Sequence, residues 1–275
     1  MNNIILCADD YAQNEAICEG ILQLVTQSRV NAISCMTNHA LWSNAQQALS
    51  AVQHTTWIGL HLNFTQGAPQ SDVWRQQVGT TFPTLTTLLR MIYLRRLDPR
   101  VVMAEIEAQI DAFTHAMNQP PDFIDGHQHI HQFPIIRECL LTLYAQRKLS
   151  AFIRQTSNGW RDLINWSHFP KTQLIALLGG IRFKHRINKQ AIPTNQSFAG
   201  IYTFTKAQHY RDAFKTFLSQ TTDGGLIMCH PGMRSEDASD PLYRSRYYEF
   251  DYLSSDTFLQ DLVDSACCLK QKVVA

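Results

Sequence analysis

Short apolar runs alternate with amphipathic stretches along the whole chain. Runs of strand length cover residues 3–8, 31–36, 57–62, 123–126, 151–154 and 225–229. Between them, apolar residues recur at helical spacing in residues 14–25, 43–52, 98–117, 135–146 and 255–269. Continuous apolar runs are typical of strands buried on both faces, and such strands alternating with helices predict a parallel sheet.

Polar side chains stand at or just past the ends of most of these predicted strands. They are Asp9, Asp10, His61, His127, Arg154 and His230. In parallel α/β folds, functional residues gather at the carboxyl ends of the strands. Residues from so many strands can converge on one axis when the sheet curls, so we predict a distorted (β/α) barrel, similar to a TIM barrel, formed as a single domain by residues 1–275. An open, doubly wound sheet is the alternative.

Two stretches depart from the regular alternation. Residues 67–88 are rich in Gln, Thr and Pro, and residues 155–200 mix Trp, Asn, Arg and Pro around one short helical run at residues 172–178. Long connections in such folds commonly shape a substrate cleft. We therefore expect both stretches to form long loops over the catalytic face. The four arginines in residues 90–100 are interpreted as a solvated loop or helix end.

Composition narrows the class of protein. Hydrophobic residues make up 45 % and charged residues 17 % of the 275 residues, and the net charge of +1 argues against nucleic acid as the main partner. No apolar stretch reaches the roughly 18 residues of a membrane span, and the start of the chain lacks the features of a signal peptide. The seven cysteines form no CxxC motif, which is typical of a reducing cytoplasm. Cys267-Cys268 are expected at helical core or boundary positions, with a redox pair as the alternative. We expect a cytoplasmic protein, with a homodimer as the default assembly.

Two adjacent carboxylates, Asp9 and Asp10, end the first predicted strand. Successive side chains of a strand point to opposite faces, so one carboxylate can face a metal ion while the other faces a reacting water. Asp10 could instead cap the following helix. His61, near the end of the third predicted strand, is either a metal ligand or a hydrogen-bonded core histidine.

Residues 125–131 hold the densest cluster of possible metal ligands, with Asp125 followed by three histidines at alternate positions. In an extended segment, residues i and i+2 share a face, so two or three imidazoles could enter one cavity. Imidazole is the commonest neutral metal ligand, and a carboxylate such as Asp125 can orient it. The cluster therefore predicts a metal site, and it leaves open whether His129 or His131 replaces or supplements His127.

His230 leaves the last predicted strand into the turn Pro231-Gly232, either as a turn residue or as a site residue. Together, these residues could form the active site of a metal-dependent hydrolase. One carboxylate and two imidazoles can hold a divalent cation and leave positions open for water and substrate. A second carboxylate can accept a proton from the water, and a separate histidine can protonate a leaving amine. This combination suits amide hydrolysis.

The sequence at this point resembles the YdjC-like carbohydrate deacetylases, the family that contains the chitooligosaccharide deacetylases. The matching segments are Ala8-Asp9-Asp10-Tyr11, Gly59-Leu60-His61-Leu62, residues 125–131 with Phe133-Pro134, His230-Pro231-Gly232, and then Arg246, Glu249 and Leu253. They occur in the family's order and span nearly the whole chain. One departure is Tyr11-Ala12, where the family usually has Phe-Gly.

The resemblance implies a distorted β/α barrel with one divalent metal ion. It implies metal ligation by Asp10, His61 and His127, with Asp9 as general base and His230 as acid. It implies that Arg154 steadies the base or contacts substrate. The implied reaction removes the N-acetyl group of an amino sugar or chitooligosaccharide and releases acetate. Two histidines and one carboxylate suit Zn²⁺, and Mg²⁺, Co²⁺, Mn²⁺ or Fe²⁺ can also occupy such a site.

Other interpretations stay open at this stage. Trp160 and Trp166 are candidates for stacking on sugar rings or for core packing. A metal-dependent amidohydrolase acting on a different amide would also use a His-x-His pair, although normally after its first strand. A non-catalytic sugar-binding or regulatory protein could keep a relic metal site, but loss of Asp9 or His230 would then be expected.

Overall fold

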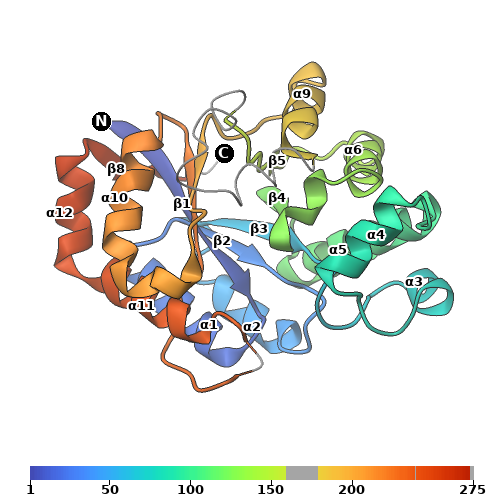
Figure 1. Cartoon of the computed structure of the whole chain (residues 1–275), viewed down its shortest axis with the longest axis horizontal. Coiled ribbons are helices and arrows are strands. Elements are labelled where there is room, and N and C mark those ends of the chain that lie inside the picture. Colours follow the sequence, from blue (N-terminus) through green and yellow to red (C-terminus); the bar gives the residue numbers. More distant parts are fainter. Residues whose placement is uncertain (159–178, 239, 273–275) are drawn as a thin grey trace.

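The described strands form one parallel sheet that curls through the centre of the molecule, with helices packed around it (Figure 1). The computed structural model describes residues 1–158, 179–238 and 240–272. Along the sheet the order is β5-β4-β3-β2-β1-β7-β6, and β8 pairs with β1 beside this path. The strands are β1 (Asn2–Tyr11), β2 (Ala32–Cys35), β3 (Trp57–Leu62), β4 (Phe123–Gly126), β5 (Phe152–Ile153), β6 (Phe198–Ala199), β7 (Leu226–Cys229) and β8 (Cys267–Leu269). The prediction of a distorted, barrel-like α/β fold is confirmed.

Helices connect the strands and cover the outside of the curl. They are α1 (Glu15–Thr26), α2 (Trp42–Leu49), α3 (Asp72–Gln77), α4 (Leu85–Tyr93), α5 (Pro99–Met117), α6 (Ile136–Gln146), α9 (Ile181–Lys189), α10 (Tyr210–Gln220), α11 (Tyr243–Ser254) and α12 (Asp256–Asp264). The 3-10 helices η1 (His127–Gln132) and η3 (Phe204–His209) precede α6 and α10. The side chain of Asn14 caps α1 by accepting a hydrogen bond from the N–H of Ile17, so Asp10 is not its N-cap.

The alternation of side chains along β1 divides the core into two layers. Leu6 and Ala8 belong to the large apolar core, which includes the buried faces of the surrounding helices. Ile5 and Cys7 belong to a second, smaller cluster on the other face of the strand. A strand repeats every two residues, so Asp9 continues the series of Ile5 and Cys7. This alternation therefore places the carboxylate of Asp9 inside the curled sheet, at the carboxyl end of β1.

Gly59 of β3 keeps this interior narrow. A Cβ added there would lie 2.4 Å from the ring of Phe123 on the neighbouring strand β4, so the aromatic ring occupies the space that a side chain would need. The next inward residues of the two strands are His61 and Asp125, which are paired in register. The apolar side chains inside the curled sheet thus end at Phe123, and the next inward side chains toward the carboxyl ends of the strands are polar.

The two ends of the sheet are joined by one backbone hydrogen bond and by the side chain of Asn195 rather than by a strand ladder. The N–H of Ile153 in β5 donates to the carbonyl of Pro193 at 2.9 Å, and the N–H of Gln155 donates to Oδ1 of Asn195 at 2.9 Å. The amide of Asn195 donates in return to the carbonyl of Gln155 at 3.0 Å. These residues lead into β6, so they bridge the interval between β5 and β6.

The predicted helix over residues 255–269 is wrong in its second half. Helix α12 ends at Asp264, and Cys267–Leu269 form β8, which pairs with Asn2–Ile4 of β1. The pairing of β1 with β2 begins at Cys7 and that with β7 at Ile5, so the start of β1 offers an unpaired edge. Completing that edge outweighs the local helical pattern, and Cys267-Cys268 are strand residues rather than helical ones.

The prediction that residues 67–88 form a long loop is also incorrect in detail. This stretch contains α3 and the start of α4, whose N-caps Ser71 and Thr84 accept hydrogen bonds from backbone N–H groups three residues later. The second predicted loop contains α9 and β6, and its helical run at residues 172–178 lies outside the described residues. Among the helices that the structure describes, none combines the length and the apolar character needed to cross a membrane.

Candidate metal centre and catalytic cavity

Asp10, His61 and His127 meet at the carboxyl ends of β1, β3 and β4. Their three ligand atoms lie within 4.8 Å of one another. Oδ1 of Asp10 is 3.4 Å from Nε2 of His61 and 2.9 Å from Nδ1 of His127. All three side chains are buried or nearly so. The structure therefore brings together the three residues that the sequence assigns to a metal.

A break in the strand aims Asp10 at this point. The pairing of β1 with β2 shifts register between Ala8 and Tyr11, and Asp10 has φ of 70°, a conformation that side-chain-bearing residues rarely adopt. Regular alternation would send Asp10 toward the helices. The irregular backbone instead turns its carboxylate toward the imidazoles, while Asp9 remains in the strand's inward series.

His61 is held by partners behind it. Its Nδ1 lies 2.6 Å from Oδ1 of Asp125 and 2.8 Å from Oγ of Ser34. Burial alone would lower the pKa of His61, but the nearby carboxylates of Asp125, Asp10 and Asp9 outweigh burial and raise it to about 10. With Nδ1 engaged by Asp125, Nε2 faces Asp10, which is the carboxylate–imidazole arrangement commonly found behind metal ligands.

Asp9 faces an arginine rather than an imidazole. Arg154, fully buried at the end of β5, donates to Oδ1 and Oδ2 of Asp9 at 2.6 and 2.7 Å and also pairs with Oδ2 of Asp125. Burial would raise the pKa of Asp9, but the charge and hydrogen bonds of Arg154 hold it well below its usual range. Asp9 is therefore an ionised carboxylate fixed in one orientation.

Cys7, Asp9 and Asp125 also lie close enough together to resemble a metal site, with their ligand atoms within 4.8 Å. The guanidinium of Arg154 contacts all three, including Sγ of Cys7 at 3.0 Å. Because a cation already satisfies these groups, this cluster positions Asp9 and does not fit a metal ion.

His230 follows β7 and faces the same cavity. Its backbone N–H donates to Oε2 of Glu249 at 2.6 Å, and the hydroxyl of Tyr202 donates to Oε1 of the same carboxylate at 2.7 Å. Glu249 is fully buried on α11, and the ring of Phe204 meets the His230 imidazole edge to face at 5.4 Å. These contacts fix the turn that presents His230.

The other two histidines of the motif do not join the metal ligands. Residues 127–132 form η1 instead of an extended segment, and Gln128 and His129 have φ of 53° and 60°. His131 turns away from Asp10, and its Nε2 lies 2.9 Å from the carbonyl oxygen of Arg154. Burial lowers the pKa of His131 to about 4. Two of the three imidazoles, those of His127 and His129, line the same cavity, as expected, whereas His131 does not. Because the backbone coils directly after His127, neither His129 nor His131 belongs to the three converging groups.

Arg246 is a residue of the site whose role the sequence did not reveal. One of its terminal nitrogens, Nη2, donates to Oδ2 of Asp10 at 2.8 Å, and its Nε donates to Oδ2 of Asp240 at 2.6 Å. Burial would raise the pKa of Asp10, but Arg246 first and His127 second hold it well below its usual range. The family pattern marked Arg246 as a shared residue, whereas its contact with Asp10, 236 positions away, depends on the fold.

These groups surround a cavity of about 440 Å³. Its polar end presents Asp9, Asp10, His61, His127 and His230, and its apolar walls include Leu85 and Leu89 of α4, Phe133, Ile201, Phe204, Met228 and Leu242. Within the first stretch predicted to wall the cleft, Leu85 does line it. Trp160 and Trp166, the proposed stacking residues, lie outside the described residues.

The three converging side chains fit a divalent cation. Atoms bound at about 2.1 Å to a tetrahedral ion lie roughly 3.4 Å apart, and the Asp10–His61 separation is 3.4 Å. Nδ1 of His61 is already held by Asp125, and among the described residues no arginine or lysine contacts all three of these side chains as Arg154 does in the neighbouring cluster. The donor set and the Asp10–His61 spacing therefore fit a divalent cation, while Oδ1 of Asp10 and Nδ1 of His127, at 2.9 Å, lie closer together than two bound ligands would.

Comparison with known proteins agrees with this architecture. The model of the family described as YdjC-like protein matches residues 3–264. A solved structure from Enterococcus faecalis, of a protein with a suggested role in cellobiose-phosphate cleavage, superimposes with a TM-score of 0.71 at 19 % identity and covers 98 % of this chain and 97 % of that one. At this level of identity the likeness shows the fold alone.

Curated relatives match over shorter segments. A carbohydrate deacetylase of Homo sapiens is 28 % identical over 136 residues, which is 48 % of this chain and 42 % of that protein. A chitooligosaccharide deacetylase of Proteus mirabilis is 28 % identical over 156 residues, which is 53 % of this chain and 56 % of that protein. The chain thus spans about half the length of the curated relatives it matches. Because the family model covers nearly its whole length, the chain belongs to the YdjC-like protein family.

Proposed function

We propose that this chain is a metal-dependent deacetylase that hydrolyses the N-acetyl group of an amino sugar or chitooligosaccharide. One observation carries the proposal: a single cavity presents three converging ligands, a separate ionised carboxylate and a separate histidine. The names of the curated relatives, carbohydrate deacetylase and chitooligosaccharide deacetylase, support the substrate class.

Asp10, His61 and His127 would hold the cation. When bound, a divalent cation supplies Lewis acidity, which acidifies water and polarises a carbonyl group. Arg246 neutralises the outer oxygen of Asp10, and Asp125 orients His61. Zn²⁺ suits these ligands, and Mg²⁺, Co²⁺, Mn²⁺ or Fe²⁺ can use the same set.

Asp9 is proposed as the general base. Arg154 engages both of its oxygens, but each carboxylate oxygen keeps a further lone pair that can accept a proton from an attacking water. Arg154 thereby positions the base and does not itself need to touch substrate. His230, which lines the same cavity, would donate a proton to the amine as the C–N bond breaks.

Acetate release tests the proposal. N-acetylglucosamine and its short β-linked oligomers would be incubated with the metal-stripped protein and with the same protein after Zn²⁺, Co²⁺, Mn²⁺ or Mg²⁺ is restored. We expect acetate from at least one glycan, only after a metal is restored, and at least about 100-fold slower release from a metal-reconstituted Asp9→Asn control. Equal acetate release by the stripped protein, or none from any N-acetylated sugar with every metal, would contradict the proposal.

A homodimer and a cytoplasmic location stay predictions. Size-exclusion chromatography with light scattering measures the first, and fractionation of cells that express the full-length protein measures the second.

A further inference from the structure

A strongly basic surface lies beside the catalytic cavity, although the chain as a whole has a net charge of only +1. Helix α9 contains Arg182, Lys184, Arg186 and Lys189 in nine residues and no carboxylate. Phe183 and Ile187 are its buried residues and Lys184 donates to the carbonyl of Ser157, while Arg182, Arg186 and Lys189 are exposed. This distribution differs from the even mixture of charges on an ordinary surface.

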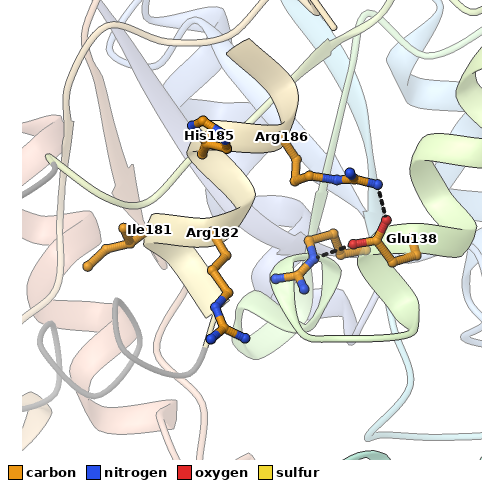
Figure 2. Close-up of a pocket in the computed structure, with 6 residues that line it drawn as sticks. Glu138, Ile181, Arg182, His185 and Arg186 are labelled. Atoms are coloured by element: carbon orange, nitrogen blue, oxygen red, sulfur yellow. Dashed lines mark hydrogen bonds and ion pairs between the residues drawn. The ribbon is translucent and has the colours of Figure 1, made fainter. Parts of the chain in front are cut away.

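Helix α6 adds to this basic surface. Arg137 and Glu138 of α6 line a hollow of about 550 Å³ together with Ile181, Arg182, His185 and Arg186 of α9 (Figure 2). Glu138 is the carboxylate of this hollow, and it already pairs with Arg137 at 3.0 Å and with Arg186 at 2.5 Å. Among the described residues, Arg182 has no ion pair. The hollow therefore keeps an excess of positive charge.

The carboxyl end of α4 continues the same surface. Arg90, Arg95 and Arg96 are exposed there, and none of them has an ion pair with another described residue. Two large apolar side chains stand among them, Tyr93 with 49 % and Leu94 with 59 % of its surface exposed. An exposed leucine and tyrosine flanked by arginines are unusual on a surface that meets only water.

The two basic regions are close in space. Figure 1 shows α4, α6 and α9 on the same side of the molecule, and the charges of Arg137 and Arg182 are near enough to act on the hydroxyl of Tyr93. Leu85 and Leu89 of α4 line the catalytic cavity. Tyr93 follows Leu85 by two helical turns, about 12 Å at 1.5 Å per residue.

We propose that this face, formed by the end of α4, α6 and α9, docks on a membrane surface that carries anionic phospholipids. Exposed arginines and lysines are attracted to the negative headgroups, while Tyr93 and Leu94 enter the boundary between headgroups and acyl chains. A nucleic acid would satisfy the arginines but would leave Leu94 in water. Docking in this way would hold the catalytic cavity beside the headgroup layer.

Vesicle co-sedimentation tests the docking. The full chain would be mixed with phosphatidylcholine vesicles that either contain or lack phosphatidylglycerol, at low and at high salt. We expect binding only to the anionic vesicles and weaker binding at high salt. Arg95→Gln with Arg96→Gln should reduce the partition coefficient by about 25-fold, since each charge near the surface contributes roughly fivefold. Leu94→Ser should reduce it by roughly fivefold.

Matched controls lie on α10 and α12, which Figure 1 shows on the opposite side of the molecule from α4, α6 and α9, and on η3, which directly precedes α10. Lys206→Gln with Lys215→Gln removes the same charge as the arginine pair, and Leu259→Ser removes an apolar side chain that is 44 % exposed. Both controls should bind vesicles like the unaltered chain.

Three outcomes would overturn the proposal. The first is no binding to anionic vesicles at low salt. The second is an equal loss of binding in the control variants, which would indicate attraction by total charge alone. The third is binding that Leu94→Ser does not weaken and that duplex DNA or inorganic phosphate abolishes at matched ionic strength. That result would assign the face to a soluble anion.

Discussion

Two neighbouring clusters at the end of the sheet are built from similar residues and behave differently. Asp10 faces the imidazoles of His61 and His127, whereas Asp9, the preceding residue, faces the guanidinium of Arg154. Each cluster contains three potential ligands within 4.8 Å. Imidazole nitrogens can share a lone pair with a metal ion, while an arginine is a permanent cation that leaves no place for one. A count of ligand types therefore does not define a metal site, because the partner of each carboxylate decides its role.

The sharpest test of this comparison exchanges each aspartate for asparagine. Asp9→Asn should lower kcat by about 10²–10⁴-fold, the usual contribution of a general base, while the metal content stays near that of the unaltered protein. Asp10→Asn should lose metal, with activity partly restored by excess metal. Metal analysis and acetate release, measured on the same preparations, check both. Metal loss in Asp9→Asn, or full metal and full activity in Asp10→Asn, would mean that the roles are reversed.

Removing the guanidinium should break the Asp9 cluster. Arg154→Leu leaves Asp9 and Asp125 buried without their cation, and breaking such a pair costs about 3–5 kcal/mol in the free energy of unfolding. Arg147→Leu is the matched control because Arg147 also contacts two carboxylates, Glu107 and Asp111, but near the surface. It should cost about 1 kcal/mol or less. Denaturant unfolding measures both values, and similar losses would show that burial does not distinguish the two arginines.

His131, which contacts the carbonyl of Arg154, should make the free energy of unfolding depend on pH. Its pKa is lowered, whereas the pKa of His61 is raised. Burial lowers the pKa of His131 to about 4 in the folded chain, against an ordinary value of 6.5. The unfolded chain therefore binds the proton first, and His131 makes the protein less stable as the pH falls from about 6.5 to about 4. The total effect is up to roughly 3 kcal/mol. His131→Asn should flatten the dependence of the unfolding free energy on pH in this window, and a curve parallel to that of the unaltered protein would contradict the assignment.

The smallest expected effect concerns the outer partner of Asp10. Arg246→Gln removes the cation that contacts Oδ2 of Asp10 and leaves all three proposed ligands in place. Residues behind metal ligands typically contribute about 10–100-fold to metal affinity, so competition with a chelator should show a loss in this range. Unchanged affinity would separate Arg246 from the metal centre and restrict its role to pairing with Asp240.

Much of the site could be predicted because strand ends are visible in the sequence. The apolar runs at residues 57–62 and 123–126 match β3 and β4, and the polar residues that end them meet in space. The orientation of Asp10 could not be predicted in this way. It depends on the register shift in β1 and on a φ of 70°, which no periodic pattern encodes. The coiling of η1, which keeps His129 and His131 out of the group of three converging ligands, could not be predicted from a periodic pattern either.

Partners that are distant in the chain were also beyond prediction. Arg246 reaches Asp10 across 236 positions, and Tyr202 reaches Glu249 across 47. Residues 267–269 carry a helical pattern, yet they form a strand because the start of β1 lacks a partner at that edge. These contacts form only when the chain folds. In residues 267–269, the pairing with β1 also outweighs a weak local preference for helix.

The sequence by itself determined the strands that carry the site, the barrel-like class and the polar residues at the strand ends, since these follow from local periodicity and from the common direction of parallel strands. The tertiary structure alone decided which carboxylate meets imidazoles and which meets an arginine. The reason is that burial makes each charge depend on the partner within a few ångströms, and that partner is supplied by a strand or helix far along the chain.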